Sequence, residues 1–180
     1  MSPPRKCAKI ARSKEGVIAV KEQKTNVMRI LDQKKIPYEA KHYPHGDDAV
    51  DGVTVAQSLG QDPASVFKTL VTHGAKGGYY VFVIPVAEEL DLKKAAKAVG
   101  EKSVAMLHVK ELLPLTGYVR GGCSPIGMKK QFSTTFHSSA LEQGTIAVSA
   151  GKIGDQVLVE PNALAKLVRG AFADIIVSEE

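Results

Sequence analysis

VFKTLVT, at residues 66–72, is the stretch that decides the fold. Its Val, Phe, Thr and Leu residues are typical of β-strands, in which successive side chains point to opposite faces of the sheet. Both faces are largely apolar here, so we expect a strand in the middle of a sheet. Lys68 is the exception, because a lysine inside such a strand must extend to solvent, pair with a carboxylate or face a cavity.

A second predicted strand, YYVFVI at 79–84, follows after a glycine-containing segment at 74–78. The elements around this pair follow no regular βαβ repeat of roughly 30 residues. This favours an α+β fold with a mixed sheet over a doubly wound parallel sheet. Apolar spacing and capping residues predict helices near 27–36, 53–59, 91–99, 108–113 and 161–168, strands near 38–43, 104–107, 145–149, 156–159 and 175–177, and a loop over 117–130.

Length and composition limit the class of protein. The 180 residues suit one domain, and an apolar content of 44% can build a core. No stretch approaches the ~20 consecutive apolar residues of a membrane helix, and the N-terminus lacks a signal-peptide pattern. Two cysteines are too few for a disulfide framework, and the histidines lack metal-binding spacing. We therefore expect a cytoplasmic protein with no metal ion and no cofactor.

The formal charge of +5 lies entirely in residues 1–24, which contain seven basic and two acidic residues. The remaining 17 basic and 17 acidic residues cancel. We therefore expect a basic extension over 1–24 and one domain over 25–180. The extension either adds affinity for RNA by counterion release or is a solvated, dispensable tail, and composition does not separate these roles.

Three places in the domain could take part in chemistry. Lys68 either extends to solvent or is an ammonium held in a pocket, where it stabilises an oxyanion or a thiolate. The stretch GGCSPIG, at 121–127, is either an ordinary connecting loop or a backbone-lined concavity, since its glycines let a ligand approach the main chain. Ser149, at the end of a predicted strand, either closes a turn or binds a substrate.

None of the familiar catalytic motifs accompanies these places. The chain has no Gly-x-Ser-x-Gly nucleophile elbow, no P-loop and no dinucleotide-binding fingerprint. Cys123 has no base partner that the sequence can assign, so we interpret it as a small loop residue. His42 and His45 flank Tyr43 and either line a pocket or lie in a surface turn.

Taken in order, these segments resemble the YbaK/EbsC family of aminoacyl-tRNA deacylases, and its YbaK branch in particular. The resemblance runs from about residue 25 to residue 177, and an ordered series of motifs over this length is far more specific than any one of them. The matching segments are IPY (36–38), HYPH (42–45), FKTL (67–70), LDLKKAAK (90–97), TGYVRGGCSPIGMKK (116–130) and AVSAGK (147–152).

The resemblance implies a single α/β domain in which helices surround a mixed, barrel-like β-sheet, related to the editing domain of bacterial prolyl-tRNA synthetases. It also implies cleavage of the ester between an amino acid and the 3′-terminal ribose of a mischarged tRNA. The family's essential lysine falls on Lys68, which would be the catalytic residue. The substrate-binding positions fall on Tyr43, Gly121, Gly122, Cys123, Ser124, Pro125, Ser149 and Gly151.

The sequence departs from the family pattern at three positions. Cys123 stands where an aliphatic residue is usual, Ala150 where glycine is common, and Gln156 where some relatives carry a carboxylate. These changes leave the lysine and the glycine loop intact. We expect them to alter the size of the pocket or the rate rather than the reaction.

We therefore expect a free-standing editing enzyme that removes cysteine from mischarged Cys-tRNA(Pro), with prolyl-tRNA synthetase as its partner. Cysteine and proline are close in size, so one synthetase pocket separates them by roughly 1–3 kcal/mol and a second site is useful. In this class the cysteine's own thiol is thought to attack the carbonyl, while Lys68 neutralises negative charge. The alternatives are a deacylase for alanine, serine or an analogue, and a non-catalytic module that binds tRNA or a synthetase.

Overall fold

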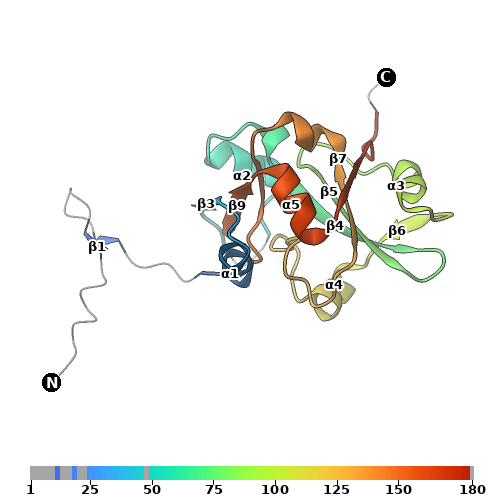
Figure 1. Ribbon diagram of the computed structural model, residues 1–180, viewed down its shortest axis with the longest axis horizontal. Coiled ribbons are helices and arrows are strands. Elements are labelled where there is room, and N and C mark those ends of the chain that lie inside the picture. Colours follow the sequence, from blue (N-terminus) through green and yellow to red (C-terminus); the bar gives the residue numbers. More distant parts are fainter. Residues whose placement is uncertain (1–10, 13–17, 20–23, 47–48, 179–180) are drawn as a thin grey trace.

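The computed structural model describes residues 11–12, 18–19, 24–46 and 49–178 (Figure 1). Before residue 24 the description covers only β1 (Ala11–Arg12) and β2 (Ile18–Ala19), which pair antiparallel. The basic extension expected over 1–24 otherwise lies outside the described residues. Helix α1 (Asn26–Gln33) begins where the apolar spacing predicts, because the Thr25 side chain accepts a hydrogen bond from the Met28 N–H and caps the helix.

A three-stranded antiparallel sheet has the order β3-β9-β8. Its register places Ser149 opposite Gln156, so these two side chains share one face of the sheet. Val148 and Val157 are paired on the opposite face, where both are buried in the core. The strands are β3 (Tyr38–His42), β8 (Ile146–Ser149) and β9 (Asp155–Val159).

A five-stranded sheet has the order β10-β7-β5-β4-β6. The two strands predicted at 66–72 and 79–84 form its antiparallel centre, β4 and β5. Strand β6 continues antiparallel on one side, whereas β7 and β10 continue parallel on the other, so the sheet is mixed as predicted. The strands are β4 (Phe67–Gly74), β5 (Tyr79–Pro85), β6 (Val104–Met106), β7 (Ser133–His137) and β10 (Ala171–Ala173).

Helices pack around the two sheets, with β6 and α3 at one end of the molecule and α1, β3 and β9 at the other (Figure 1). The sequence predicts the bounds of α3 well, because Asp91 accepts hydrogen bonds from two N–H groups of its first turn and Gly100 ends it with a φ of 75°. The other helical elements are α2 (Gly52–Ser58), α4 (Val109–Thr116) and α5 (Pro161–Val168), with 3-10 turns η2 (Pro63–Ser65) and η3 (Ser138–Glu142). None of the described helices is long and apolar enough to cross a membrane.

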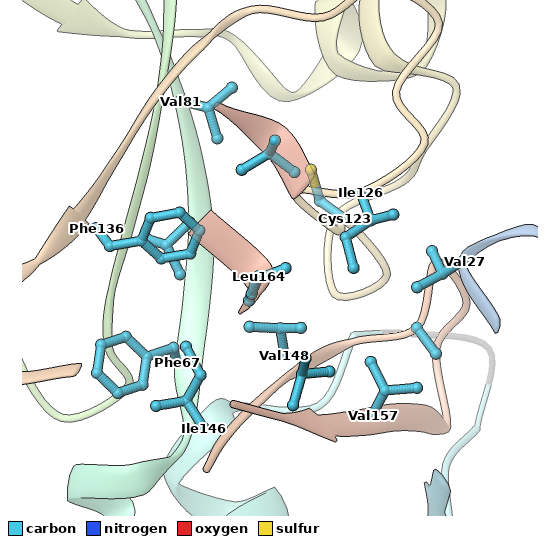
Figure 2. Packing of buried hydrophobic residues seen from close by; sticks show 14 of the residues in the cluster. Val27, Phe67, Val81, Cys123, Ile126, Phe136, Ile146, Val148, Val157 and Leu164 are labelled. Atoms are coloured by element: carbon cyan, nitrogen blue, oxygen red, sulfur yellow. The ribbon is translucent and has the colours of Figure 1, made fainter. Parts of the chain in front are cut away.

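The main hydrophobic core lies between the two sheets (Figure 2). Phe67, Val81 and Phe136 enter it from the five-stranded sheet, and Val148 and Val157 from the three-stranded sheet. Helices α1 and α5 and the loop after α4 close it with Val27, Leu164, Cys123 and Ile126. Because each of these side chains is less than one-tenth exposed, the core fixes the position of both sheets.

Three sequence-based expectations are wrong. Helix α4 runs through Pro114 instead of ending before it, because Gly117 ends the helix in the left-handed region and its N–H bonds the Leu113 carbonyl. Strand β7 was not expected, since STTFH has too few apolar residues to show the usual pattern. The last strand is β10 rather than 175–177, where the structure has only an isolated bridge between Ile176 and Leu90.

Among the described residues, the backbones of the two sheets pair at one point. A single parallel bridge joins Val66, just before β4, to Ala147 of β8. Beyond this bridge the free edge of β4 finds its next strand partner, β6, only at Thr72. The described strands therefore form two mixed or antiparallel sheets that diverge from this bridge, and the edge of β4 between Val66 and Thr72 borders an opening.

Candidate active site

The opening between β4 and β8 contains a cavity with a volume of about 120 Å³. Lys68 and Thr69 of β4 line one side, which we call the β4 wall. Ser149 and Gln156 line the opposite side, which we call the β8–β9 wall. The remaining lining residues come from β3, α2 and the loops around them: Tyr43, Val50, Gly52, Val55, Val66, Phe67, Val86, Gly121, Cys123, Val148 and Asp155.

Lys68 sits where this cavity meets a second, larger hollow. The larger hollow has a volume of about 870 Å³ and shares five lining residues with the cavity: Val50, Gly52, Lys68, Thr69 and Gly121. Arg120 and the exposed side chains of Val109 and Val119 line its outer part. Lys68 is therefore one of the residues at the junction between the hollow and the cavity.

The polar groups of the β4 wall have no protein partner within the described ranges. Lys68 is half-buried, and none of the ion pairs or hydrogen bonds formed by described residues engages its ammonium. The Thr69 hydroxyl oxygen is fully buried and equally unpaired. The Lys68 ammonium is not fully buried and is therefore the group of this wall that can pair with a polar ligand, whereas the Thr69 hydroxyl is enclosed by protein.

The polar groups of the β8–β9 wall are held by neighbours. The Ser149 hydroxyl oxygen accepts a hydrogen bond from the Gly151 N–H at 3.2 Å, which leaves its proton available to the cavity. Gln156 is only 4% exposed, and its Oε1 accepts a hydrogen bond from Gln61 Nε2 at 2.5 Å. Both side chains therefore have fixed positions before any ligand binds.

The glycine loop closes the cavity between the two walls. Gly121 has a φ of +87°, and a Cβ at this position would lie 2.6 Å from the Ala49 Cβ, so no larger residue fits without displacement. The Gly122 N–H donates to the Val119 carbonyl at 3.0 Å, and the buried Ser124 hydroxyl accepts from the Ile126 N–H at 3.2 Å. The loop is therefore held by its own hydrogen bonds.

Two further residues hold the loop and the β3 side of the cavity. The Tyr118 hydroxyl donates to the Ile126 carbonyl at 2.6 Å, and burial raises the pKa of this phenol to about 12. Tyr43, which is 9% exposed, is held through its backbone N–H, which donates to the Gly154 carbonyl at 2.9 Å. These bonds fix the main chain at two places in the cavity rim.

Cys123 lines the cavity but is a poor nucleophile. Its side chain is 8% exposed, and burial raises the pKa of the thiol to about 12. Since the thiolate is the reactive form, almost none is present near neutral pH.

The structure brings five of the nine predicted site residues to the cavity: Tyr43, Lys68, Gly121, Cys123 and Ser149. The other four, Gly122, Ser124, Pro125 and Gly151, are not part of its lining. Gly122, Ser124 and Pro125 are buried in the loop, and Gly151 packs beside Tyr118 and Val27 with a φ of +93°. These four support the residues that line the cavity.

Sequence reasoning did not single out Thr69 or Asp155 as parts of the site, and it named Gln156 only as a departure from the family pattern that could alter the pocket. Thr69 follows the catalytic candidate directly, and Asp155 pairs with the His42 ring through its carboxylate. Gln156 could have been found from its register with Ser149, but that register depends on strand pairing. Within the described ranges no three His, Cys, Asp or Glu side chains lie close enough together to hold a metal ion.

The chain is similar in sequence to proteins that act on charged tRNA. Residues 47–167 match the family model of the aminoacyl-tRNA editing domain. An Enterococcus faecalis protein, named as a candidate Cys-tRNA(Pro)/Cys-tRNA(Cys) deacylase, EbsC, is 51% identical over 158 residues, which cover 88% of this chain and 96% of that protein.

Solved structures show the same fold. A structure described as a candidate trans-editing enzyme for prolyl-tRNA synthetase has a TM-score of 0.73 at 23% identity and covers 84% of this chain and 95% of its own. The hypothetical protein APE2540 has a TM-score of 0.75 at 20% identity and covers 84% of this chain and 99% of its own. At these identities the similarity establishes the fold alone, and it confirms the expected class of mixed α/β domain.

Proposed function

Because this chain belongs to the aminoacyl-tRNA editing domain family, we propose that it is a free-standing deacylase that removes cysteine from mischarged Cys-tRNA(Pro). The observation that carries the proposal is the position of Lys68. Its ammonium has no partner among the described residues and lies where a small cavity meets a larger hollow. An aminoacyl-tRNA has the same division, with a small amino acid joined by one ester to a large nucleotide.

The two volumes suit the two parts of this substrate. A water molecule needs about 10–15 Å³ of such space, so 120 Å³ holds on the order of ten water-sized groups. That is enough for a cysteinyl group and the ester atoms, but leaves little room for a bulky side chain. The larger hollow, with Arg120 on its rim, suits the 3′-terminal nucleotide and its phosphate. The ester then lies beside Lys68.

In the proposed reaction the substrate supplies its own nucleophile. The thiol loses its proton to solvent, and the sulfur attacks the carbonyl carbon to form a C–S bond and a tetrahedral oxyanion. Collapse breaks the ester C–O bond, the ribose 3′-oxygen takes up a proton, and water later opens the cyclic thioester to give cysteine. Lys68 stabilises the thiolate and the oxyanion, since a positioned positive charge is worth most where negative charge develops.

Two features of the cavity support this scheme over an enzyme nucleophile. The Cys123 thiol is protonated near neutral pH, because burial raises its pKa to about 12. The Ser149 hydroxyl accepts a hydrogen bond from the Gly151 N–H and has no histidine among its hydrogen-bond partners within the described ranges. A serine without a base is a weak nucleophile.

The remaining parts of the proposal concern the chain's surroundings. We take residues 25–180 as the catalytic domain, residues 1–24 as a basic extension, and the cytoplasm, where tRNA is charged, as its compartment. Prolyl-tRNA synthetase is the proposed partner that supplies tRNA specificity, because the domain has as many acidic as basic residues beyond residue 24. Adding the synthetase is then expected to increase the rate on Cys-tRNA(Pro).

A panel of mischarged tRNAs tests the proposed activity. Wild-type protein should deacylate Cys-tRNA(Pro) and act poorly on Ser-tRNA(Pro) and Ala-tRNA(Pro), because neither a hydroxyl nor a methyl group replaces the thiol as nucleophile. Equal rates on Cys- and Ser-tRNA would reject the substrate-thiol mechanism. Hydrolysis of Ala-tRNA alone would assign the enzyme to another amino acid, and tRNA binding without hydrolysis would make it a binding module.

A further inference from the structure

The side-chain amide of Gln156, in the β8–β9 wall, is hydrogen-bonded to a second amide behind it, that of Gln61. Gln61 follows α2, and its backbone N–H donates to the Ala56 carbonyl at 2.8 Å, which fixes the main chain there. Its Nε2 donates to Gln156 Oε1 at 2.5 Å. Gln61 is not part of the cavity lining, whereas Gln156 is. Gln61 therefore touches the site only through Gln156.

The hydrogen bond from Gln61 occupies the oxygen of the Gln156 amide and leaves its nitrogen free. Gln156 is 4% exposed and shares its face of the sheet with Ser149, which also lines the cavity. Its Oε1 is occupied, and no acceptor in the described part of the chain bonds its Nε2. Nε2 is not fully buried and Gln156 lines the cavity, so its N–H groups are free to donate to a ligand there.

We propose that Gln61 is a positioning residue, which holds the Gln156 amide so that its N–H groups donate to the carbonyl oxygen of the bound aminoacyl ester. This inference rests on the proposed function. The carbonyl oxygen accepts hydrogen bonds in the substrate and gains negative charge in the transition state, so a second donor facing Lys68 stabilises the same atom from the other wall.

The opposite orientation of the pair is sterically available, which is why Gln61 matters. An amide that turns by half a revolution exchanges its oxygen and nitrogen in nearly the same volume. Gln61 Oε1 is buried and has no donor, so the neighbouring protein does not lock this side chain by itself. If Gln61 presented an acceptor, Gln156 would turn to donate to it and would show its oxygen to the cavity. That oxygen would repel the oxyanion.

Three substitutions at Gln61 test the inference, because they differ in what they offer to Gln156. Gln61→Lys can only donate, Gln61→Glu can only accept when ionised, and Gln61→Met does neither at similar size. We expect kcat on Cys-tRNA(Pro) to fall about 100-fold in Gln61→Glu, as for the loss of one oxyanion donor. The kcat of Gln61→Lys should stay within about threefold of wild type, and that of Gln61→Met should lie between the values of the other two variants. KM should change little in all three.

A purely structural role for Gln61 predicts a different order. Both charged variants would then lose activity together, in step with their loss of thermal stability, and this result would overturn the inference. Equal activity of Gln61→Glu and wild type would overturn it too.

The failure of the proposed function is distinguishable from the failure of this inference. The wild-type rates across the panel of mischarged tRNAs test the function alone. If wild type prefers another aminoacyl-tRNA, the same variants are compared on that substrate, and the predicted order of Lys, Met and Glu at position 61 remains the criterion.

Discussion

The two walls of the cavity use polar side chains in opposite ways. On the β4 wall, the Lys68 ammonium and the Thr69 hydroxyl have no partners within the described residues. On the β8–β9 wall, the Ser149 and Gln156 oxygens accept hydrogen bonds from Gly151 and Gln61. The β4 wall therefore offers the Lys68 ammonium to a ligand, and the β8–β9 wall holds its groups in fixed orientations.

From this difference, β4 supplies the group that takes part in the reaction, and β8 and β9 supply the groups that position the substrate. A buried polar group without a partner, such as the Thr69 hydroxyl, costs about 1–3 kcal/mol of stability, whereas the accessible Lys68 ammonium can pair with a ligand. The edge of β4 is open to a ligand there, because no described strand pairs with it between Val66 and Thr72. Substitution of Lys68 on β4 should therefore reduce activity without loss of stability, whereas substitution of Ser149 on β8 should affect both.

The largest effect is expected at Lys68. Lys68→Met keeps the length of the side chain but removes the charge, so kcat on Cys-tRNA(Pro) should fall about 10²–10³-fold in single-turnover assays. The midpoint of thermal unfolding should not decrease, because no protein partner loses an ion pair. Lys93→Met, on the exposed face of α3, is the matched control and should behave as wild type. A Lys68→Met enzyme with normal kcat would remove Lys68 from the mechanism.

Two threonines of β4 sharpen the comparison. The Thr69 hydroxyl is buried and unpaired, whereas the buried Thr72 hydroxyl donates to the Tyr80 carbonyl at 3.2 Å. Thr69→Val should raise the free energy of unfolding by about 1 kcal/mol, whereas Thr72→Val should lower that free energy by about 1 kcal/mol, and kcat should change little in both variants. Urea titration of both variants measures whether the free energy of unfolding rises or falls. Destabilisation by Thr69→Val would show that its hydroxyl has a partner after all.

A smaller effect on both quantities is expected at Ser149. Ser149→Ala removes the acceptor of the Gly151 N–H, so we expect a loss of about 0.5–1.5 kcal/mol in the free energy of unfolding and a kcat reduced about threefold to tenfold. Ser138→Ala, remote from the cavity lining, serves as control. Loss of activity as severe as that of Lys68→Met would instead make Ser149 a nucleophile.

The smallest effect on activity is expected at Cys123, which lies in the loop between the walls. Cys123→Ala should keep kcat within about twofold near neutral pH, because the thiol is protonated there. Its pKa is raised to about 12 in the folded protein, so the unfolded chain ionises first, and stability falls as pH rises from about 9 towards 12. Urea titrations at pH 8 to 11 should show a decline that is shallower in Cys123→Ala by one proton; an identical decline would contradict the raised pKa.

The sequence predicts well those parts of the fold that local chemistry decides. Thr25 and Asp91 cap their helices through hydrogen bonds within three residues, and Gly100 ends α3 because it adopts a positive φ. Parts decided by distant contacts were missed. Strand β7 lies between β5 and β10, and its polar STTFH sequence has no local signal of that position.

The same limit applies to the site. Lys68, Gly121 and Ser149 could be placed together because their ordered motifs resemble a known family, and the structure brings all three to one cavity. The amide pair could not be found, because Gln61 and Gln156 are 95 positions apart and meet only after β8, β9 and α2 have packed. Likewise, only the folded structure shows whether a polar side chain has a hydrogen-bond partner.

The most direct test of the central claim is a crystal structure with a non-hydrolysable substrate analogue, 3′-cysteinylamino-3′-deoxyadenosine, in which an amide replaces the ester. The measurement is the distance between Lys68 Nζ and the carbonyl oxygen of the analogue. We predict a hydrogen bond of about 2.7–3.2 Å, with the cysteinyl group in the cavity and the adenosine in the larger hollow. An analogue bound with its carbonyl beyond the reach of Lys68 would contradict the account.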